Sequence, residues 1–169
     1  MSSMHGPDYQ LANLPRAGFG KRLGAGIYDA LLALAVYAFA GIIGFALFAL
    51  CARAGLISVP ASLSLADALR QNSLYHGLYQ CWLLCAVAGF YGYFWSRAGQ
   101  TLGMQAWRLR VQHCNGQNLS IITALARCVW SLLGLGNLWL LLGRQQLALQ
   151  DWLTGSEVVV LPTQRHHSR

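Results

Sequence analysis

The sequence predicts an all-α membrane protein: a transmembrane helical bundle with a re-entrant or interfacial helical segment and a small cytoplasmic β-pair. Two observations carry this prediction. Hydrophobic residues make up 56% of the 169 residues and charged residues only 10%, whereas a soluble domain carries about 25% charged residues. Several segments are also apolar enough, for long enough, to enter a membrane. A very apolar soluble bundle is the less favoured alternative, because too few charges remain to cover a water-facing surface.

The chain divides into three predicted parts. Residues 1–16 contain Gly, Pro, Ser and Asn with little periodicity, which predicts a flexible N-terminal tail. Residues 17–161 contain the apolar segments and form the predicted transmembrane domain. Residues 162–169 form a basic C-terminal tail.

The first predicted span is Ala30–Ala52, which contains no charged residue and directly follows Asp29. A helix rises about 1.5 Å per residue, so this stretch is long enough to cross a hydrocarbon core of about 30 Å. It is too long for the apolar region of a signal peptide, which spans about 7–15 residues, and a long tail precedes it. We therefore predict a transmembrane helix with Asp29 at its entrance.

The second predicted span is Gly77–Ser96, which ends in the aromatic residues Tyr91, Tyr93, Phe94 and Trp95. Tyr and Trp prefer the level of the lipid headgroups, so this cluster is expected to mark a membrane boundary. The connection between the two spans, Arg53–Ser73, is more polar. Within it, Leu63–Leu69 is predicted to form a short interfacial helix.

A third apolar segment, Leu119–Leu142, contains Arg127 and a break at Gly134, Gly136 and Asn137. If this segment turns back, the cytoplasmic side carries nine Lys and Arg residues against two outside, with Arg127 left out. If it crosses fully, the counts are six against five. The positive-inside rule favours the first arrangement. We therefore prefer two full spans plus a re-entrant or interfacial hairpin, with three full crossings as the alternative.

Two short segments predict strands. Trp107–His113 alternates in polarity and is followed by the turn signal Asn115-Gly116. Ser156–Leu161 is a run rich in β-branched residues. Pairing of the two strands would satisfy backbone groups that are otherwise left open. This pairing requires both segments to lie on the cytoplasmic side, as they do if the third apolar segment turns back.

The predicted site is a cluster of four charged residues beside apolar segments: Arg22, Asp29, Asp151 and Arg127. Arg22 and Asp29 are seven residues apart, so a helix places them on one face, about 10 Å apart along the axis. A charge at the bilayer centre costs at least about 2.5–3.5 kcal/mol, so such residues are usually paired or face an aqueous path. We expect either a structural charge cluster or part of an ion or substrate path.

Four sequence runs, in order, resemble the RDD family of small membrane proteins: AGFGKRLGAGIYDALL, GQTLGMQAWRLRVQHCNGQNLS, ALARCVW and LALQDWLTGSEVVV. The resemblance covers about Ala17–Leu161. The family is named for an arginine and two aspartates, which correspond here to Arg22, Asp29 and Asp151. It implies a multi-pass membrane protein, and transport is suggested for some relatives.

Two departures from the family pattern are visible. The usual threonine after Gly155 is Ser156 here. The stretch between Arg127 and Arg144 is also short for the family, which further disfavours two full crossings there.

The sequence contains no pattern typical of an enzyme. It has no Gly-rich phosphate loop, no zinc-ligand spacing and no Ser/His/Asp arrangement. We therefore expect no catalytic residues, no cofactor and no metal site.

The five cysteines are odd in number and lie mostly in or beside apolar segments, which indicates packing rather than a disulfide framework. The net charge of +7 comes without a dense basic run, so we expect no nucleic-acid partner.

Two functions remain. The first is a transport-related protein of the cytoplasmic or inner membrane, with a cytoplasmic N-terminus, in which Asp29 and Asp151 bind a small cation or a proton. Because the chain is small for a complete carrier, we expect a homo-oligomer. The second is a non-catalytic accessory or scaffold protein that assists assembly or binds anionic membrane lipid through its arginines.

Overall fold

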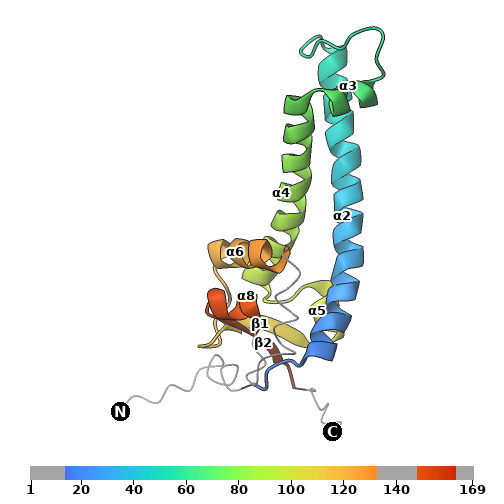
Figure 1. Ribbon diagram of the computed structural model, residues 1–169. Helices are drawn as coiled ribbons and strands as arrows, with labels where there is room; N and C mark the ends of the chain where they lie inside the picture. The colour runs from blue at the N-terminus through green and yellow to red at the C-terminus, as the bar shows by residue number, and fades with distance from the viewer. Residues whose placement is uncertain (1–13, 133–147, 163–169) are drawn as a thin grey trace. The chain divides into compact units, whose positions relative to one another are not determined.

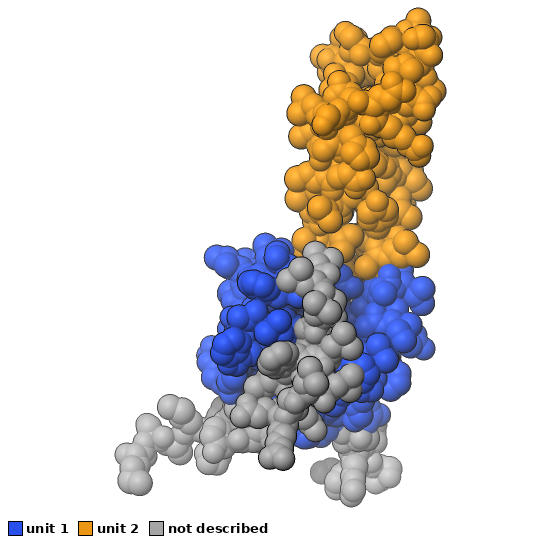
Figure 2. Space-filling model, viewed as in Figure 1, with its two compact units in different colours: residues 1–31, 91–169 blue, residues 32–90 orange. Residues whose placement is uncertain are grey.

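The computed structural model of the protein describes residues 14–132 and 148–162. Contacts group these residues into two compact units, which Figure 2 colours separately. Unit 1 comprises the residues up to Leu31 together with those from Tyr91 onward, and unit 2 comprises Leu32–Phe90. The two predicted tails lie almost entirely outside the described residues, as does the predicted break in the third apolar segment.

The longest helix, α2, runs over Phe19–Arg53 and contains the whole first predicted span (Figure 1). Within the described ranges it is the one helix that is both long and apolar enough to cross a membrane. Only 11% of its most apolar stretch is buried, so it differs from the core helix of a soluble protein. Phe39 and Ile42, for example, are 69% and 68% exposed. A surface of this kind has to be covered by lipid or by another protein.

Helices α3 (Leu65–Gln71) and α4 (Ser73–Arg97) follow. α3 confirms the short helix that was predicted in the connection, and α4 contains the whole second predicted span, Gly77–Ser96. The start of α3 is fixed by Ser64, whose hydroxyl accepts a hydrogen bond from the Asp67 backbone N–H at 3.1 Å. Such N-caps satisfy a donor that the helix itself leaves open.

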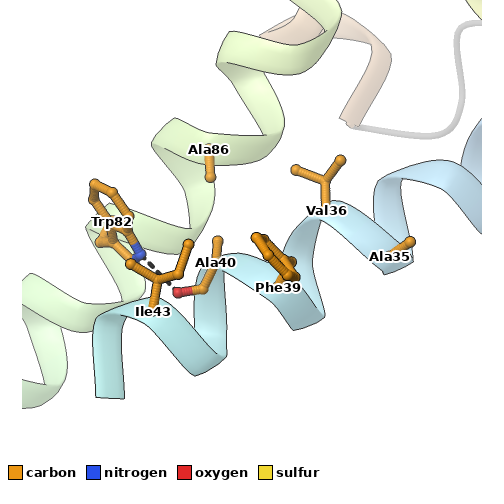
Figure 3. Close-up of a pocket in the computed structure, with 7 residues that line it drawn as sticks. All are labelled: Ala35, Val36, Phe39, Ala40, Ile43, Trp82 and Ala86. Carbon is orange, nitrogen blue, oxygen red and sulfur yellow. Dashed lines mark hydrogen bonds between the residues drawn. The ribbon is translucent and has the colours of Figure 1, made fainter. Parts of the chain in front are cut away.

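In unit 2, aromatic side chains of α4 pack on glycines and carbonyls of α2. The Tyr79 hydroxyl donates to the Gly41 carbonyl at 3.1 Å. The Trp82 indole N–H donates to the Ala40 carbonyl at 2.9 Å, as Figure 3 shows. A Cβ at Gly44 would lie 2.9 Å from Trp82 Cδ1, so only glycine allows this approach. The polar tips of both aromatic residues are therefore satisfied within the apolar helix pair.

An apolar groove of about 510 Å³ lies beside this contact in unit 2 (Figure 3). Its lining combines small and bulky apolar side chains: Ala35, Val36, Phe39, Ala40, Ile43, Trp82 and Ala86. Because the Trp82 N–H already bonds to Ala40, that donor is not available to an occupant of the groove.

Unit 1 is built on a two-stranded antiparallel sheet of β1 (Leu109–His113) and β2 (Ser156–Val160), with Val111 opposite Val158. This confirms the predicted strand pairing. β1 begins later than predicted, because Arg108 has a φ of 54° and interrupts the extended backbone after Trp107. Pro15–Ala17 runs along the other edge of β2, where the Ala17 N–H donates to the Val158 carbonyl at 2.8 Å.

Three short helices pack around this sheet: α5 (Leu102–Ala106) contacts β1, α8 (Leu149–Leu153) contacts β2, and α6 (Ile121–Leu132) contacts α8. The core that they share with the sheet and the helix ends is small and apolar, and includes Ala25, Trp95, Met104, Leu109, Val111, Leu119, Ala124 and Val158. α6 forms the first part of the third predicted apolar segment. It lies across the last turns of α4, where a Cβ at Gly92 would lie 3.1 Å from Leu125. The described fold is therefore mostly helical with one small sheet, as predicted.

Candidate functional site

Three of the four predicted charged residues meet in the interior of unit 1. Asp151, in α8, is 0% exposed and forms ion pairs with both Arg22 of α2 and Arg127 of α6. The pair with Arg127 joins Nη2 to Oδ1 at 2.5 Å, and the pair with Arg22 joins Nη1 to Oδ2. Each carboxylate oxygen therefore has its own guanidinium. We call Arg22, Asp151 and Arg127 the charge triad.

The two arginines of the charge triad are also anchored by neutral groups. Arg22 Nε donates to the Ala17 carbonyl at 3.0 Å, which ties α2 to the segment along the sheet edge. Arg127 Nη1 donates to the Ser156 hydroxyl at 2.5 Å, and its guanidinium lies 5.4 Å from the centre of the Trp95 ring. A cation over an indole face is attracted by the ring electrons. The triad thus connects α2, α4, α6, α8 and β2 within unit 1.

Ser156 keeps the hydroxyl that the resemblance implies at this position. Threonine, which the resemblance implies there, carries the same hydroxyl that accepts from Arg127. Ser156 is 1% exposed, so the hydroxyl has no access to bulk water and depends on the protein for its partners. The departure from the pattern therefore preserves the chemistry.

Asp151 also caps the helix that carries it. Its Oδ2 accepts a hydrogen bond from the Ala148 backbone N–H at 3.2 Å, at the N-terminus of α8. Burial by itself would raise the pKa of Asp151, but the positive charges of Arg127 and Arg22 and their hydrogen bonds outweigh it and hold the pKa below its ordinary value. Asp151 is therefore an ionised, doubly paired carboxylate at neutral pH.

Asp29, the fourth predicted residue, lies in a different environment. It is 6% exposed. Its Oδ2 accepts from the Thr101 hydroxyl at 2.5 Å, and its Oδ1 accepts from the Gly103 backbone N–H at 3.0 Å. Both donors are neutral, and over residues 14–132 and 148–162 no ion pair of Asp29 is present. The structure therefore divides the four predicted residues into the charge triad and a separate carboxylate.

The Gly99–Gly103 motif supplies the hydrogen-bond donors that hold the Asp29 carboxylate. Gly99 has a φ of 65°, and a Cβ there would lie 2.8 Å from the Val111 carbonyl oxygen, so the turn requires glycine. Thr101 is the N-cap of α5, and its hydroxyl accepts from the Met104 N–H at 3.2 Å while donating to Asp29. Gly103 places the start of α5 directly against α2, since a Cβ there would lie 2.5 Å from the Ala25 carbonyl oxygen.

Four residues of the site, Thr101, Gly103, Trp95 and Ser156, were not predicted as site residues. Thr101 and Gly103 stand inside a motif that was recognised, and the sequence Gly-Gln-Thr-Leu-Gly reads as a turn followed by an N-cap. Their partner, Asp29, lies more than seventy positions away in the sequence, so the local motif does not reveal it. Trp95 was interpreted as a boundary aromatic, and its cation contact has no local sequence signal.

The described residues thus form a mostly helical protein with one long apolar helix and a buried charge triad. Comparison with protein families makes the assignment specific: the model of the RDD family matches residues 16–155, and the chain belongs to the RDD family. The predicted family is thus confirmed. No curated protein and no solved structure matches the chain. Family membership and α2 together indicate a membrane protein.

Proposed function

We propose that the chain is a multi-pass protein of the cytoplasmic or inner membrane, in which α2 and α4 both cross the bilayer and unit 1 lies on the cytoplasmic side with the N-terminus. The distribution of charge supports this orientation. Unit 2 contains Arg53 and Arg70, whereas the described part of unit 1 contains seven basic residues: Arg16, Lys21, Arg22, Arg97, Arg108, Arg110 and Arg127. Positive charge concentrates on the cytoplasmic side of membrane proteins.

In this proposal α6 lies in the membrane interface and does not cross. Its inner face is small or charged, with Ala124 and Arg127 buried, while its outer face exposes Ile122 and Val129 by 76% and 62%. In a soluble protein a helix turns its apolar face inward. The reversed arrangement fits a helix that rests its apolar face in the lipid headgroup and acyl boundary.

We further propose a transport-related function in which Asp29 is the group that binds a proton or a small cation. The observation that carries this proposal is the buried Asp29 carboxylate, held by the neutral donors Thr101 and Gly103. A carboxylate with neutral partners can take up a positive charge without displacing an arginine. Asp29 also stands at the cytoplasmic entrance of the apolar stretch Ala30–Ala52, where an ion path through the helices would begin.

The proposal assigns Asp151 a different role from the one expected from the sequence, where it shared the binding of the cation. Both of its oxygens are occupied by arginines, and a cation approaching it would meet two positive charges. We therefore assign the charge triad to the framework that holds α2, α6 and α8 together, with no catalytic role for any of its members.

Replacement of Asp29 tests the function. We expect Asp29→Asn to abolish cation-coupled proton flux in proteoliposomes, because the amide cannot change its charge. The amide oxygen still accepts a hydrogen bond from Gly103 or Thr101, so the fold is expected to remain. Flux would be followed with an internal pH dye after a pulse of Na⁺ or K⁺. Unchanged flux in a folded Asp29→Asn protein would contradict the proposal.

The matched control is Asp67→Asn, which removes an exposed carboxylate at the N-terminus of α3 in unit 2. Its flux should equal that of the unmodified protein. If the unmodified protein gives no cation-dependent signal, the second function, an accessory protein that binds anionic lipid, gains support. The exposed basic side chains Lys21, Arg97 and Arg108 of unit 1 favour that function.

A further inference from the structure

The outer face of α4 carries a stripe of small and polar residues that also contains the exposed Leu84. Gly77, Gln80, Cys81, Leu84 and Ala88 recur at spacings of three and four, so they share one side of the helix. The opposite side holds Tyr79, Trp82 and Leu83; the first two bond to α2 and Leu83 is 2% exposed. In the striped face, every residue except the half-buried Ala88 is exposed. Within unit 2, this side of α4 therefore faces away from α2.

The depth of Gln80 follows from the hydrogen bonds on either side of it. Tyr79 donates a hydrogen bond to Gly41, and Figure 3 shows the hydrogen bond from Trp82 to Ala40. Gln80 is thus level with the part of α2 around Gly41, which is the middle of the uncharged stretch Ala30–Ala52. If α2 and α4 cross the membrane as proposed above, this glutamine lies near the centre of the hydrocarbon core.

A glutamine amide at that depth lacks partners in lipid. Its side chain carries two N–H donors and a carbonyl acceptor. Gln80 is exposed on the helix surface, and in the described segments none of these groups forms a hydrogen bond. Acyl chains offer neither donors nor acceptors, so a polar group in this position requires a protein partner.

We propose that this face of α4 binds the same face of a second copy of the chain, with the two Gln80 amides hydrogen-bonded to each other across a twofold axis. An amide is its own complement, because each side chain supplies both a donor and an acceptor. A twofold interface brings identical patches together, which fits a self-complementary group. Gly77 and Cys81 are small enough to let the two helices approach closely. The proposal rests on the membrane crossing of α4.

The exposed surface of α2 is the less suitable alternative. At the same depth as Gln80 it presents Phe39 and Ile42, which are large, apolar and well solvated by acyl chains. Neither carries a polar group that needs a partner. The amide on α4 therefore identifies which helix forms the contact between the copies.

Disulfide cross-linking of the full chain in liposomes tests the proposal. In a variant that retains Cys81 as its single cysteine, copper phenanthroline should produce a cross-linked dimer. The control is a cysteine-free chain with Phe39→Cys, which places a thiol at a similar depth on α2; we expect no cross-linked dimer from it.

Gln80→Leu should raise the dissociation constant of the dimer by about 3- to 30-fold, the range for one polar contact between helices in lipid. Gln80→Asn should retain most of the association.

The outcomes separate this proposal from the one on membrane topology. If Cys81 is shielded from a charged maleimide but does not cross-link, the interface is wrong while the crossing of α4 stands. If the charged maleimide modifies Cys81 in intact liposomes, α4 does not cross, and the interface is overturned together with the topology. Equal association of the unmodified and Gln80→Leu chains would also overturn the interface.

Discussion

Asp151→Asn is expected to lower the free energy of unfolding by about 3–5 kcal/mol, the cost of removing one partner from a buried ion pair. The variant keeps the shape of the side chain but removes the negative charge that neutralises Arg22 and Arg127. Both arginines are almost fully buried, so water cannot replace the lost partner. Equilibrium denaturation in detergent micelles would measure the loss.

The matched control for Asp151→Asn is again Asp67→Asn. Asp67 lies in the first turn of the short helix α3, where an acidic side chain contributes less than about 1 kcal/mol. A loss from Asp151→Asn no larger than that of this control would show that the charge triad does not hold unit 1 together.

The pH dependence gives an independent check of the same contact. Because the pKa of Asp151 is lowered in the folded protein, its stabilising contribution is fully present above the unfolded pKa of about 3.9 and is lost as the pH falls through the folded value. Acidification from pH 7 should therefore destabilise the unmodified protein more than Asp151→Asn. Parallel curves for the two proteins would contradict the lowered pKa.

Gly103→Ala is expected to destabilise unit 1 by about 1–3 kcal/mol, as overpacking of a tight contact does. The new Cβ would lie 2.5 Å from the Ala25 carbonyl oxygen and 2.7 Å from Asp29 Oδ1. The first of these atoms belongs to the α2 backbone and cannot turn aside. α5 must therefore move away from α2, which lengthens the hydrogen bonds from Gly103 and Thr101 to Asp29. Denaturation under the same conditions measures the cost.

The control for Gly103→Ala is Gly26→Ala, in the same region of α2 and next to Ala25. A Cβ at Gly26 meets no atom within 4 Å. Alanine is also the better helix former, by about 1 kcal/mol, so this variant should be neutral or slightly stabilised. Equal stabilities for Gly103→Ala and Gly26→Ala would mean that α5 is not packed against α2 at this position.

Local chemistry predicted the strands well and the helix ends poorly. The β-branched run before Pro162 and the turn at Asn115-Gly116 indicated β2 and the end of β1 correctly. The apolar span was predicted from Ala30, whereas the helix that contains it, α2, already begins at Phe19. Hydropathy marks where lipid contact is favourable, whereas a helix continues through charged residues such as Arg22 and Asp29 when a folded unit supplies their partners.

The site was predicted in part for a physical reason. Charges beside apolar segments need partners, which correctly brings Arg22, Asp151 and Arg127 together. The same argument could not assign Asp29, because neutral donors such as the Gly103 N–H leave no charge pattern in a sequence. Only the folded position of α5 against α2 reveals them.

Cysteine labelling of intact cells tests the proposed transmembrane α2–α4 hairpin with unit 1 on the cytoplasmic side. One cysteine-free chain would carry Ser62→Cys in the exposed connection before α3, and another would retain the exposed Cys114 of unit 1. A membrane-impermeant maleimide should label position 62 in intact cells and Cys114 only after permeabilisation. Labelling of both positions in intact cells, or of neither, would contradict the hairpin.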